Sequence, residues 1–146
     1  MISAVIFDFG HTLMDELQFR DVPLRSRPVH LMPGVLEVLP RISISKSIWT
    51  NTKRVKEPGI RHWLRRGHID QHFKWVITSV DLGYRKPDPR FFAYALKQCG
   101  LNRQDVLFVG NQLNTDIKGA VEYGIQMSGY RAENTEALMT PWRPAA

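Results

Sequence analysis

The sequence predicts an α/β fold in which helices cover both faces of a parallel sheet of about five strands. Short apolar runs that suit buried strands alternate along the chain with segments whose apolar residues recur at helical spacing. Parallel strands need crossover connections, and right-handed crossovers place the helices on the two faces of the sheet. With 146 residues, 43% of them hydrophobic, the chain has the size and composition of one domain.

Five apolar runs are the expected strands, and they lie at residues 4–7, 47–50, 75–78, 106–109 and 125–128. Between them, four groups of apolar residues have helical spacing and are expected to share one face of each helix. These are Val35, Leu36, Val38 and Leu39, then Ile60, Trp63 and Leu64, then Phe91, Phe92, Ala95, Leu96 and Cys99, and finally Ile117, Ala120 and Val121. The resulting three-layer α/β/α arrangement is Rossmann-like, and such folds bind ligands at the carboxyl ends of their strands.

The expected core spans residues 1–130. Residues 131–146 carry two prolines and little periodicity, so we expect a tail with partial disorder. The polar segment 14–32 is expected to be a loop or short hairpin, because it is too short to hold an inserted cap domain.

Twenty Lys and Arg against fourteen Asp and Glu give a net charge of +6, which favours anionic partners. Basic residues are not interleaved with aromatic ones as in many nucleic-acid-binding segments, so a solvated basic surface is the simpler interpretation. Cys99 is the only cysteine, which excludes an intrachain disulfide and a zinc finger and favours the cytoplasm. No apolar stretch is long enough to predict a membrane span.

The first candidate site residue is Asp8, directly after the first predicted strand. A carboxylate in that position needs compensation by a metal, a lysine or backbone N–H groups. Such a carboxylate can attack phosphorus and form an aspartyl phosphate. The alternative is that Asp8 starts a tight turn with Gly10.

Thr50 and Asn51 end the second predicted strand. A hydroxyl and an amide at a strand end can form hydrogen bonds with phosphate oxygens. The alternative is purely structural, because a β-branched residue often ends a strand before an Asn turn.

Lys86 stands in the run Gly-Tyr-Arg-Lys-Pro-Asp-Pro, just before a predicted helix. Asp88 and Pro89 have a structural explanation as the N-cap and the first helical residue. Lys86 has none. Its ammonium could neutralise both a nucleophilic carboxylate and phosphoryl oxygens.

Asn111 and Asp116 follow the fourth predicted strand and offer oxygen ligands suited to Mg²⁺. For Asp116 the alternative is an acid in the first turn of a helix, stabilised by the helix dipole, with Thr115 as the N-cap.

Taken together, these four clusters resemble the four motifs of the haloacid dehalogenase-like superfamily, in the same order and each at a strand exit. The Lys-Pro-Asp-Pro match is the sharpest, and the resemblance covers residues 3–129. It implies a phosphatase in which Asp8 is the nucleophile, Thr50 binds a phosphate oxygen and Lys86 neutralises charge. By the same resemblance, Phe9, Gly10, His11 and Asn51 complete the phosphate site, and Mg²⁺ is bound by Asp8, the Gly10 carbonyl, Asn111 and Asp116.

The sequence departs from that pattern at two positions. Gly10 stands where the family's phosphatases usually carry an aspartate that serves as general acid and base, a loss that typically costs ~10² to 10⁴ in rate. His11 could substitute for it, although a histidine that caps a turn is the simpler interpretation. Asn111 stands where a metal-binding aspartate is usual, which predicts weak Mg²⁺ affinity because the amide carries no charge.

The leading functional prediction is a Mg²⁺-dependent phosphatase. The alternatives are a catalytically weakened module that binds phosphate or another protein, and a nucleic-acid 3′-phosphatase. Without a cap, an open site favours a phosphorylated macromolecule or closure by a second subunit of a homodimer. His62, His68 and His72 are expected to be surface residues rather than metal ligands.

Overall fold

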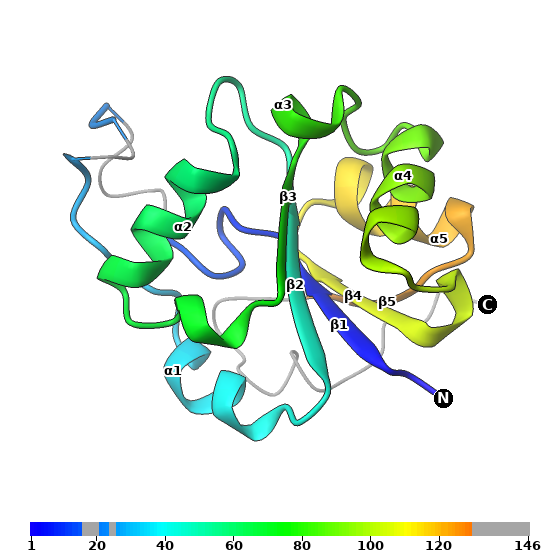
Figure 1. Ribbon diagram of the computed structural model, residues 1–146, viewed down its shortest axis with the longest axis horizontal. Coiled ribbons are helices and arrows are strands. Elements are labelled where there is room, and N and C mark those ends of the chain that lie inside the picture. The colour runs from blue at the N-terminus through cyan, green and yellow to red at the C-terminus, as the bar shows by residue number, and fades with distance from the viewer. Residues whose placement is uncertain (16–20, 24–25, 130–146) are drawn as a thin grey trace.

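The structure of the protein is a computed structural model, and it describes residues 1–15, 21–23 and 26–129 (Figure 1). Its centre is a sheet of five strands in the order β3-β2-β1-β4-β5, with every neighbouring pair parallel. The strands are β1 (Ala4–Phe7), β2 (Ser45–Thr50), β3 (Trp75–Thr78), β4 (Val106–Gly110) and β5 (Gln126–Gly129). The predicted parallel sheet is therefore confirmed, and each predicted strand overlaps an observed one. The expected tail, residues 131–146, lies outside the described residues.

Helices cover the two faces of the sheet, as predicted (Figure 1). On one side lie α1 (Val35–Val38) and α2 (Glu57–Arg66), and on the other lie α4 (Pro89–Cys99) and α5 (Lys118–Tyr123). The short α3 (Ser79–Leu82) follows β3 directly. The single turns are η2 (Leu39–Arg41), η3 (Asp70–His72), η4 (Arg103–Asp105) and the π-helical η5 (Leu113–Ile117).

The central strand β1 is buried on both faces, which explains its continuous apolar sequence. Because side chains alternate along a strand, Phe7 joins the cluster beneath α1 and α2, whereas Ile6 joins the cluster beneath α4 and α5. Both clusters are rich in aromatic residues, including Trp63 on the first side and Trp49 on the second, each fully buried. Burying a side chain of this size stabilises the fold by roughly 1.5–3 kcal/mol.

The helix that follows Lys86 begins as the sequence predicts. The Asp88 side chain caps α4 by accepting a hydrogen bond from the backbone N–H of Arg90 (2.9 Å), and Pro89 is the first helical residue. Gly100 ends the helix in a left-handed conformation with φ 66°. These two ends fix the position of the loop that carries Lys86.

Two apolar residues do not face the core as predicted, since Leu36 is 58% exposed and Val121 is 39% exposed. Successive residues of a helix are rotated by about 100°. Their neighbours Val35 and Ala120 occupy the core side, so the next residue in each helix turns away from it.

The two ends of the connection between β1 and α1 pair with each other. Met14 forms an antiparallel bridge with Leu31, and the backbone N–H of Asp15 donates to the carbonyl oxygen of His30 (2.8 Å). The described residues of this connection form no separate domain. This pairing agrees with the predicted loop or short hairpin.

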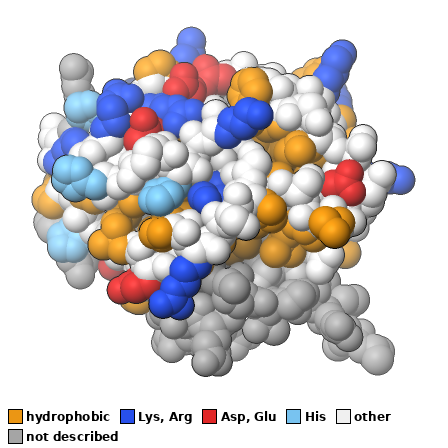
Figure 2. Space-filling view, turned by 60° about the horizontal axis from the view of Figure 1, so that its bottom comes forward, with side chains coloured by type: hydrophobic (Ala, Val, Ile, Leu, Met, Phe, Trp, Pro, Cys, Tyr) orange, Lys and Arg blue, Asp and Glu red, His pale blue; other side chains and the backbone are white. Residues whose placement is uncertain are grey.

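The described surface mixes charged and apolar side chains. Figure 2 shows basic side chains distributed among acidic and apolar ones on one face, without a single continuous basic patch. His62 and His68 are exposed, as expected, and His72 is half-buried. Among the described residues, no helix has the length and apolar character needed to cross a membrane. Cytoplasmic location stays a prediction.

Candidate active site

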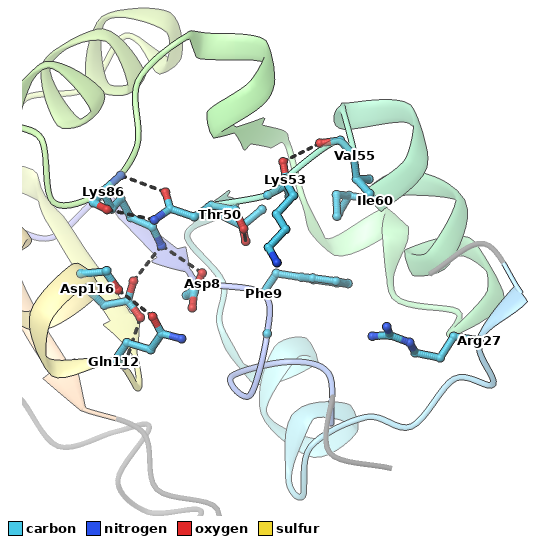
Figure 3. Close-up of a pocket in the computed structure, with 14 residues that line it drawn as sticks. Asp8, Phe9, Arg27, Thr50, Lys53, Val55, Ile60, Lys86, Gln112 and Asp116 are labelled. Carbon is cyan, nitrogen blue, oxygen red and sulfur yellow. Dashed lines mark hydrogen bonds and ion pairs between the residues drawn. The ribbon is translucent and has the colours of Figure 1, made fainter. Parts of the chain in front are cut away.

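Lys86 joins two carboxylates at the carboxyl edge of the sheet (Figure 3). Its Nζ lies 2.9 Å from Asp8 Oδ1 and 2.7 Å from Asp116 Oδ1, and it also donates to the carbonyl oxygen of Trp49 at 2.9 Å. The Lys86 side chain is 1% exposed, so these acceptors replace water around its three N–H groups. Asp8, Trp49 and Asp116, which lie far apart in the sequence, therefore all contact the ammonium group of Lys86.

The burial of this cluster shifts its protonation equilibria. Burial raises the pKa of Asp8 from 3.8 to about 6, an effect that Lys86 opposes and Asp116 reinforces. Burial alone would lower the pKa of Lys86, but the two carboxylates together raise it above its ordinary value. At neutral pH Asp8 is therefore ionised beside the Lys86 ammonium.

Asn51 fixes the backbone of Lys86 to the end of β2. Its Nδ2 donates to the Lys86 carbonyl oxygen (2.9 Å), and its Oδ1 accepts from the Lys86 backbone N–H (2.8 Å). Both polar atoms of the side chain are therefore engaged, which makes Asn51 a positioning residue in this structure. The neighbouring Thr50 is 3% exposed and donates from Oγ1 to the Asn51 carbonyl oxygen (3.3 Å).

Asp116 is held by the turn that follows β4. Its Oδ1 contacts Lys86 and its Oδ2 accepts from the backbone N–H of Gln112 (3.1 Å). A glycine is needed at position 110 because a Cβ there would lie 2.7 Å from the Cβ of Asp116. Asp116 does lie in the first turn of a helix, η5, as the alternative expected, but it is only 1% exposed and is ion-paired with Lys86. Thr115 is not the expected N-cap, because its hydroxyl donates to the Gln112 side chain and Ile117 is the N-cap of α5.

A cavity of about 460 Å³ opens over this cluster, which is a volume typical of sites for small ligands. It brings together most of the predicted site residues, namely Asp8, Phe9, Gly10, Thr50, Asn51, Lys86 and Asp116. It is also lined by residues that the sequence does not predict for the site, namely Arg27, Thr52, Lys53, Val55, Ile60, Gln112 and Thr115.

The family model of the haloacid dehalogenase-like hydrolases matches residues 18–130. The chain belongs to this family. Because the matched range begins after Asp8, the position of Asp8 in the first motif rests on the geometry above, where Lys86 and Asp116 surround its carboxylate.

The chain is 38% identical over 80 residues to glyceraldehyde 3-phosphate phosphatase from Methanothermobacter thermautotrophicus, which is 53% of the chain and 35% of that protein. It is 29% identical over 97 residues to phosphoglycolate phosphatase 1 from Pseudomonas aeruginosa, covering 64% of the chain and 34% of that protein. The chain thus spans about a third of the length of these curated relatives.

Solved structures agree with the hydrolase fold. An uncharacterised protein from Listeria monocytogenes serotype 4b superimposes with a TM-score of 0.79 at 26% identity, covering 89% of this chain and 79% of that one. The HAD-hydrolase YfnB from Bacillus subtilis, described as bound to magnesium, gives a TM-score of 0.70 at 16% identity, covering 86% and 85%. At that identity the second likeness shows the fold alone.

Two predicted site residues are not among the described residues that line the cavity, namely His11 and Asn111. His11 has a left-handed backbone with φ 58°, and its N–H donates to the Met14 carbonyl oxygen (2.8 Å), so it occupies the turn after the first motif. Its role in phosphate binding or proton transfer stays a prediction.

Oxygen atoms are the candidate metal ligands at this site. The described residues contain no cluster of three or more His, Cys, Asp or Glu side chains suited to a metal. The Asn111 Oδ1 atom, however, is buried and has no hydrogen-bond partner among the described residues. Such an atom is costly unless something binds it, and a hard cation would do so. Because the Asp8 N–H donates to Val109, Asp8 and Asn111 both lie where β1 and β4 end side by side.

The site residues that were not predicted differ in whether the sequence carries a signal for them. Lys53 follows Asn51 by two positions at a strand exit, so the same reasoning that selected Asn51 could have found it. Arg27 belongs to an irregular segment whose path does not follow from periodicity. The carbonyl oxygen of Trp49, which accepts from Lys86, belongs to the backbone, so no residue type in the sequence points to it.

Proposed function

We propose that this chain is a phosphatase that hydrolyses phosphate monoesters through an aspartyl phosphate on Asp8. The observation that supports this proposal most strongly is the contact of one buried ammonium, Lys86, with both Asp8 and Asp116 at the base of a cavity. An ion pair of this kind is not needed for the fold, because apolar residues of similar volume often replace such pairs without loss of stability.

In the first step, an Asp8 carboxylate oxygen attacks phosphorus while the bond between phosphorus and the ester oxygen breaks. Lys86 contacts Oδ1, which leaves Oδ2 as the attacking atom. The raised pKa of Asp8, about 6, still leaves the carboxylate ionised at neutral pH. Lys86 stabilises the negative charge that builds on the phosphoryl oxygens.

In the second step, water attacks the phosphorus of the aspartyl phosphate, and the bond from phosphorus to Asp8 breaks to release inorganic phosphate. Position 10 is a glycine, so no side chain there can donate a proton to the leaving group or accept one from water. We therefore expect slow turnover of ordinary esters and faster turnover of esters with good leaving groups.

The proposed function includes Mg²⁺. The residues present could bind this ion, but few of them would bring a negative charge to it. The Asp8 carboxylate and the unpartnered Oδ1 of Asn111 would hold the ion. Both oxygens of Asp116 already accept hydrogen bonds, so its role as a metal ligand stays a prediction. When bound, Mg²⁺ supplies charge neutralisation for the phosphoryl group.

The test compares the wild type with Asp8→Asn on p-nitrophenyl phosphate and a panel of phosphate monoesters in the presence of Mg²⁺. Asp21→Asn is the matched control, since Asp21 is an exposed residue of the β1–α1 connection. We expect background turnover for Asp8→Asn and wild-type turnover for the control. Equal turnover by Asp8→Asn and wild type would remove Asp8 from the chemistry, and a wild type that binds phosphate without turnover would favour a non-catalytic phosphate-binding module.

A further inference from the structure

The side-chain donors predicted to bind a phosphoryl group already donate to acceptors within the protein. The ammonium group of Lys86 has three N–H bonds, and it donates them to two carboxylates and one backbone carbonyl oxygen. Asn51 Nδ2 donates to the Lys86 carbonyl oxygen, and Thr50 Oγ1 donates to the Asn51 carbonyl oxygen. A side chain with an unused donor beside this cluster is therefore a candidate for phosphate binding.

Gln112 lies beside this cluster and lines the same cavity (Figure 3). Its backbone N–H donates to Asp116 Oδ2 (3.1 Å), and the other oxygen of that carboxylate contacts Lys86 Nζ (2.7 Å). Figure 3 shows the nitrogen atom of the Gln112 side chain turned toward the side of the cavity on which Asp8 and Phe9 lie. The amide therefore belongs to the end of the cavity where the candidate nucleophile is.

The backbone of Gln112 is fixed by the turn that follows it. Its carbonyl oxygen accepts from the N–H groups of Asp116 (2.9 Å) and Ile117 (3.1 Å). The second of these bonds has the spacing of a π-helix, and η5 is π-helical. Such turns are rare and occur frequently at functional sites. Because these bonds involve only the backbone of Gln112, they do not depend on its side chain.

Thr115 orients the side-chain amide of Gln112. Its Oγ1 donates to Gln112 Oε1 (2.9 Å), and Thr115 also lines the cavity. Because the oxygen and the nitrogen lie on opposite sides of the planar amide, this bond turns Nε2 and its two N–H donors away from Thr115. No described residue accepts a hydrogen bond from this nitrogen. Both donors are thus available to a ligand in the cavity.

We propose that Gln112 is a phosphate-binding residue of this site, with Thr115 as the residue that positions it. Gln112 Nε2 donates a hydrogen bond to a non-bridging oxygen of the phosphoryl group. The proposal rests on the phosphatase function, because it takes the Asp8 end of the cavity as the site of the reacting phosphate. A neutral amide supplies this donor without competing with Lys86 for the carboxylates. The same contact is expected with released phosphate, so it can be measured on inorganic phosphate alone.

The test is a titration of inorganic phosphate into the isotope-labelled protein in the presence of Mg²⁺, followed by NMR. The side-chain amide signal of Gln112 is assigned by its loss in Gln112→Met, which removes the donor. Gln112→Glu keeps the shape of the side chain and an acceptor for Thr115 but has no N–H. Asn114→Ala is the control, because Asn114 is an exposed residue of the same turn and is not among the described residues that line the cavity.

We expect the amide signal of Gln112 to shift as phosphate is added to the wild type, because its N–H groups gain an acceptor. Phosphate affinity, followed through backbone signals, should fall about tenfold in Gln112→Met. It should fall further in Gln112→Glu, whose carboxylate repels the anion, whereas a merely structural role would be kept by this variant of equal shape. Asn114→Ala should bind phosphate like the wild type.

The role of Thr115 is tested by a pair of variants. Thr115→Val removes the hydroxyl that orients the amide and should lose part of the same affinity, and Thr115→Ser should recover most of that loss because it restores the hydroxyl. A Gln112 amide signal that does not move with phosphate, or an affinity unchanged in Gln112→Met, overturns the proposal. The exposed side chain of Gln112 makes a folding defect improbable, and urea unfolding of each variant checks this.

Turnover of p-nitrophenyl phosphate by wild type, Asp8→Asn and Gln112→Met is measured in parallel, so that the two proposals fail separately. We expect kcat/KM to fall about tenfold in Gln112→Met and to background in Asp8→Asn. Turnover that depends on Asp8, with phosphate binding that is the same without the Gln112 amide, contradicts the role of Gln112 alone. Phosphate binding through Gln112 without turnover that depends on Asp8 supports the binding residue and contradicts the phosphatase.

Discussion

At the residue scale, the side chain of Lys86 compensates two buried carboxylates at once. Lys86→Met would leave Asp8 and Asp116, whose side chains are only 9% and 1% exposed, without their common cation. Breaking a buried ion pair in this way typically costs about 3–5 kcal/mol. We expect a loss of that order in the free energy of unfolding, measured with urea near neutral pH, together with loss of phosphatase activity. Lys97→Met, which removes an exposed lysine of α4, is the control, and a similar small change in both variants would contradict this account.

The raised pKa of Asp8 makes a second prediction at this scale. The pKa of Asp8 in the folded protein, about 6, lies above its ordinary value of 3.8, so the unfolded chain releases this proton first as pH rises. The contribution of Asp8 to stability is therefore complete below about pH 4 and is lost as pH rises through about 6. Asp8→Asn removes this loss, so the variant should match wild type near pH 4 and exceed it by about 2–3 kcal/mol near pH 7.5, without metal. Urea unfolding at both pH values measures this, and an Asp8→Asn variant less stable than wild type at the higher pH would contradict it.

At the scale of elements, Asn51 at the end of β2 fixes the position of the loop that carries Lys86 before α4. Asn51→Ala removes two hydrogen bonds to the backbone of Lys86, which should cost about 1–3 kcal/mol of stability and lower kcat by displacing the ammonium. Asn102→Ala, at an exposed position before η4, is the matched control. Measurements of urea unfolding and of kcat for both variants test this. An Asn51→Ala enzyme with wild-type kcat would show that Lys86 is positioned by its ion pairs alone.

The same elements show what the sequence could predict. Strands β1, β3 and β4 were predictable because each is a short apolar run, whereas β2 begins with polar residues at Ser45, two positions before the predicted strand. The start of α4 was predictable because Asp88 and Pro89 suit a helix N-terminus in a way few residues do. Lys86 could be predicted as a site residue because no structural role explains a lysine just before the helix. The role of Asn51 was not, because an amide that binds phosphate and one that binds a neighbouring backbone look identical in a sequence. The place of Arg27 in the cavity depends on the path of an irregular segment, which leaves no periodic signal.

At the scale of the whole molecule, the parallel strands β1 and β4 end side by side at the candidate site, where position 111 holds an uncharged amide. Asn111→Asp adds a carboxylate where β4 ends, and it should raise Mg²⁺ affinity about tenfold or more, since charge count tunes the affinity of oxygen sites for hard cations. Calorimetric titration of Mg²⁺ into both proteins measures the change. Asn114→Asp, an exposed change in the same turn, should leave the affinity close to that of wild type. Tight Mg²⁺ binding by the wild type, at micromolar concentration, would contradict the expected weak site.

The central claim is that Asp8 carries the phosphoryl group during turnover. The most direct measurement quenches the working enzyme in acid with Mg²⁺ and a phosphate monoester, reduces it with borohydride, and maps its peptides by mass spectrometry. An acyl phosphate is reduced to the alcohol, so the account predicts homoserine at position 8 only when substrate is present. Phosphate release with an unmodified Asp8, or with homoserine formed at another aspartate, would contradict it.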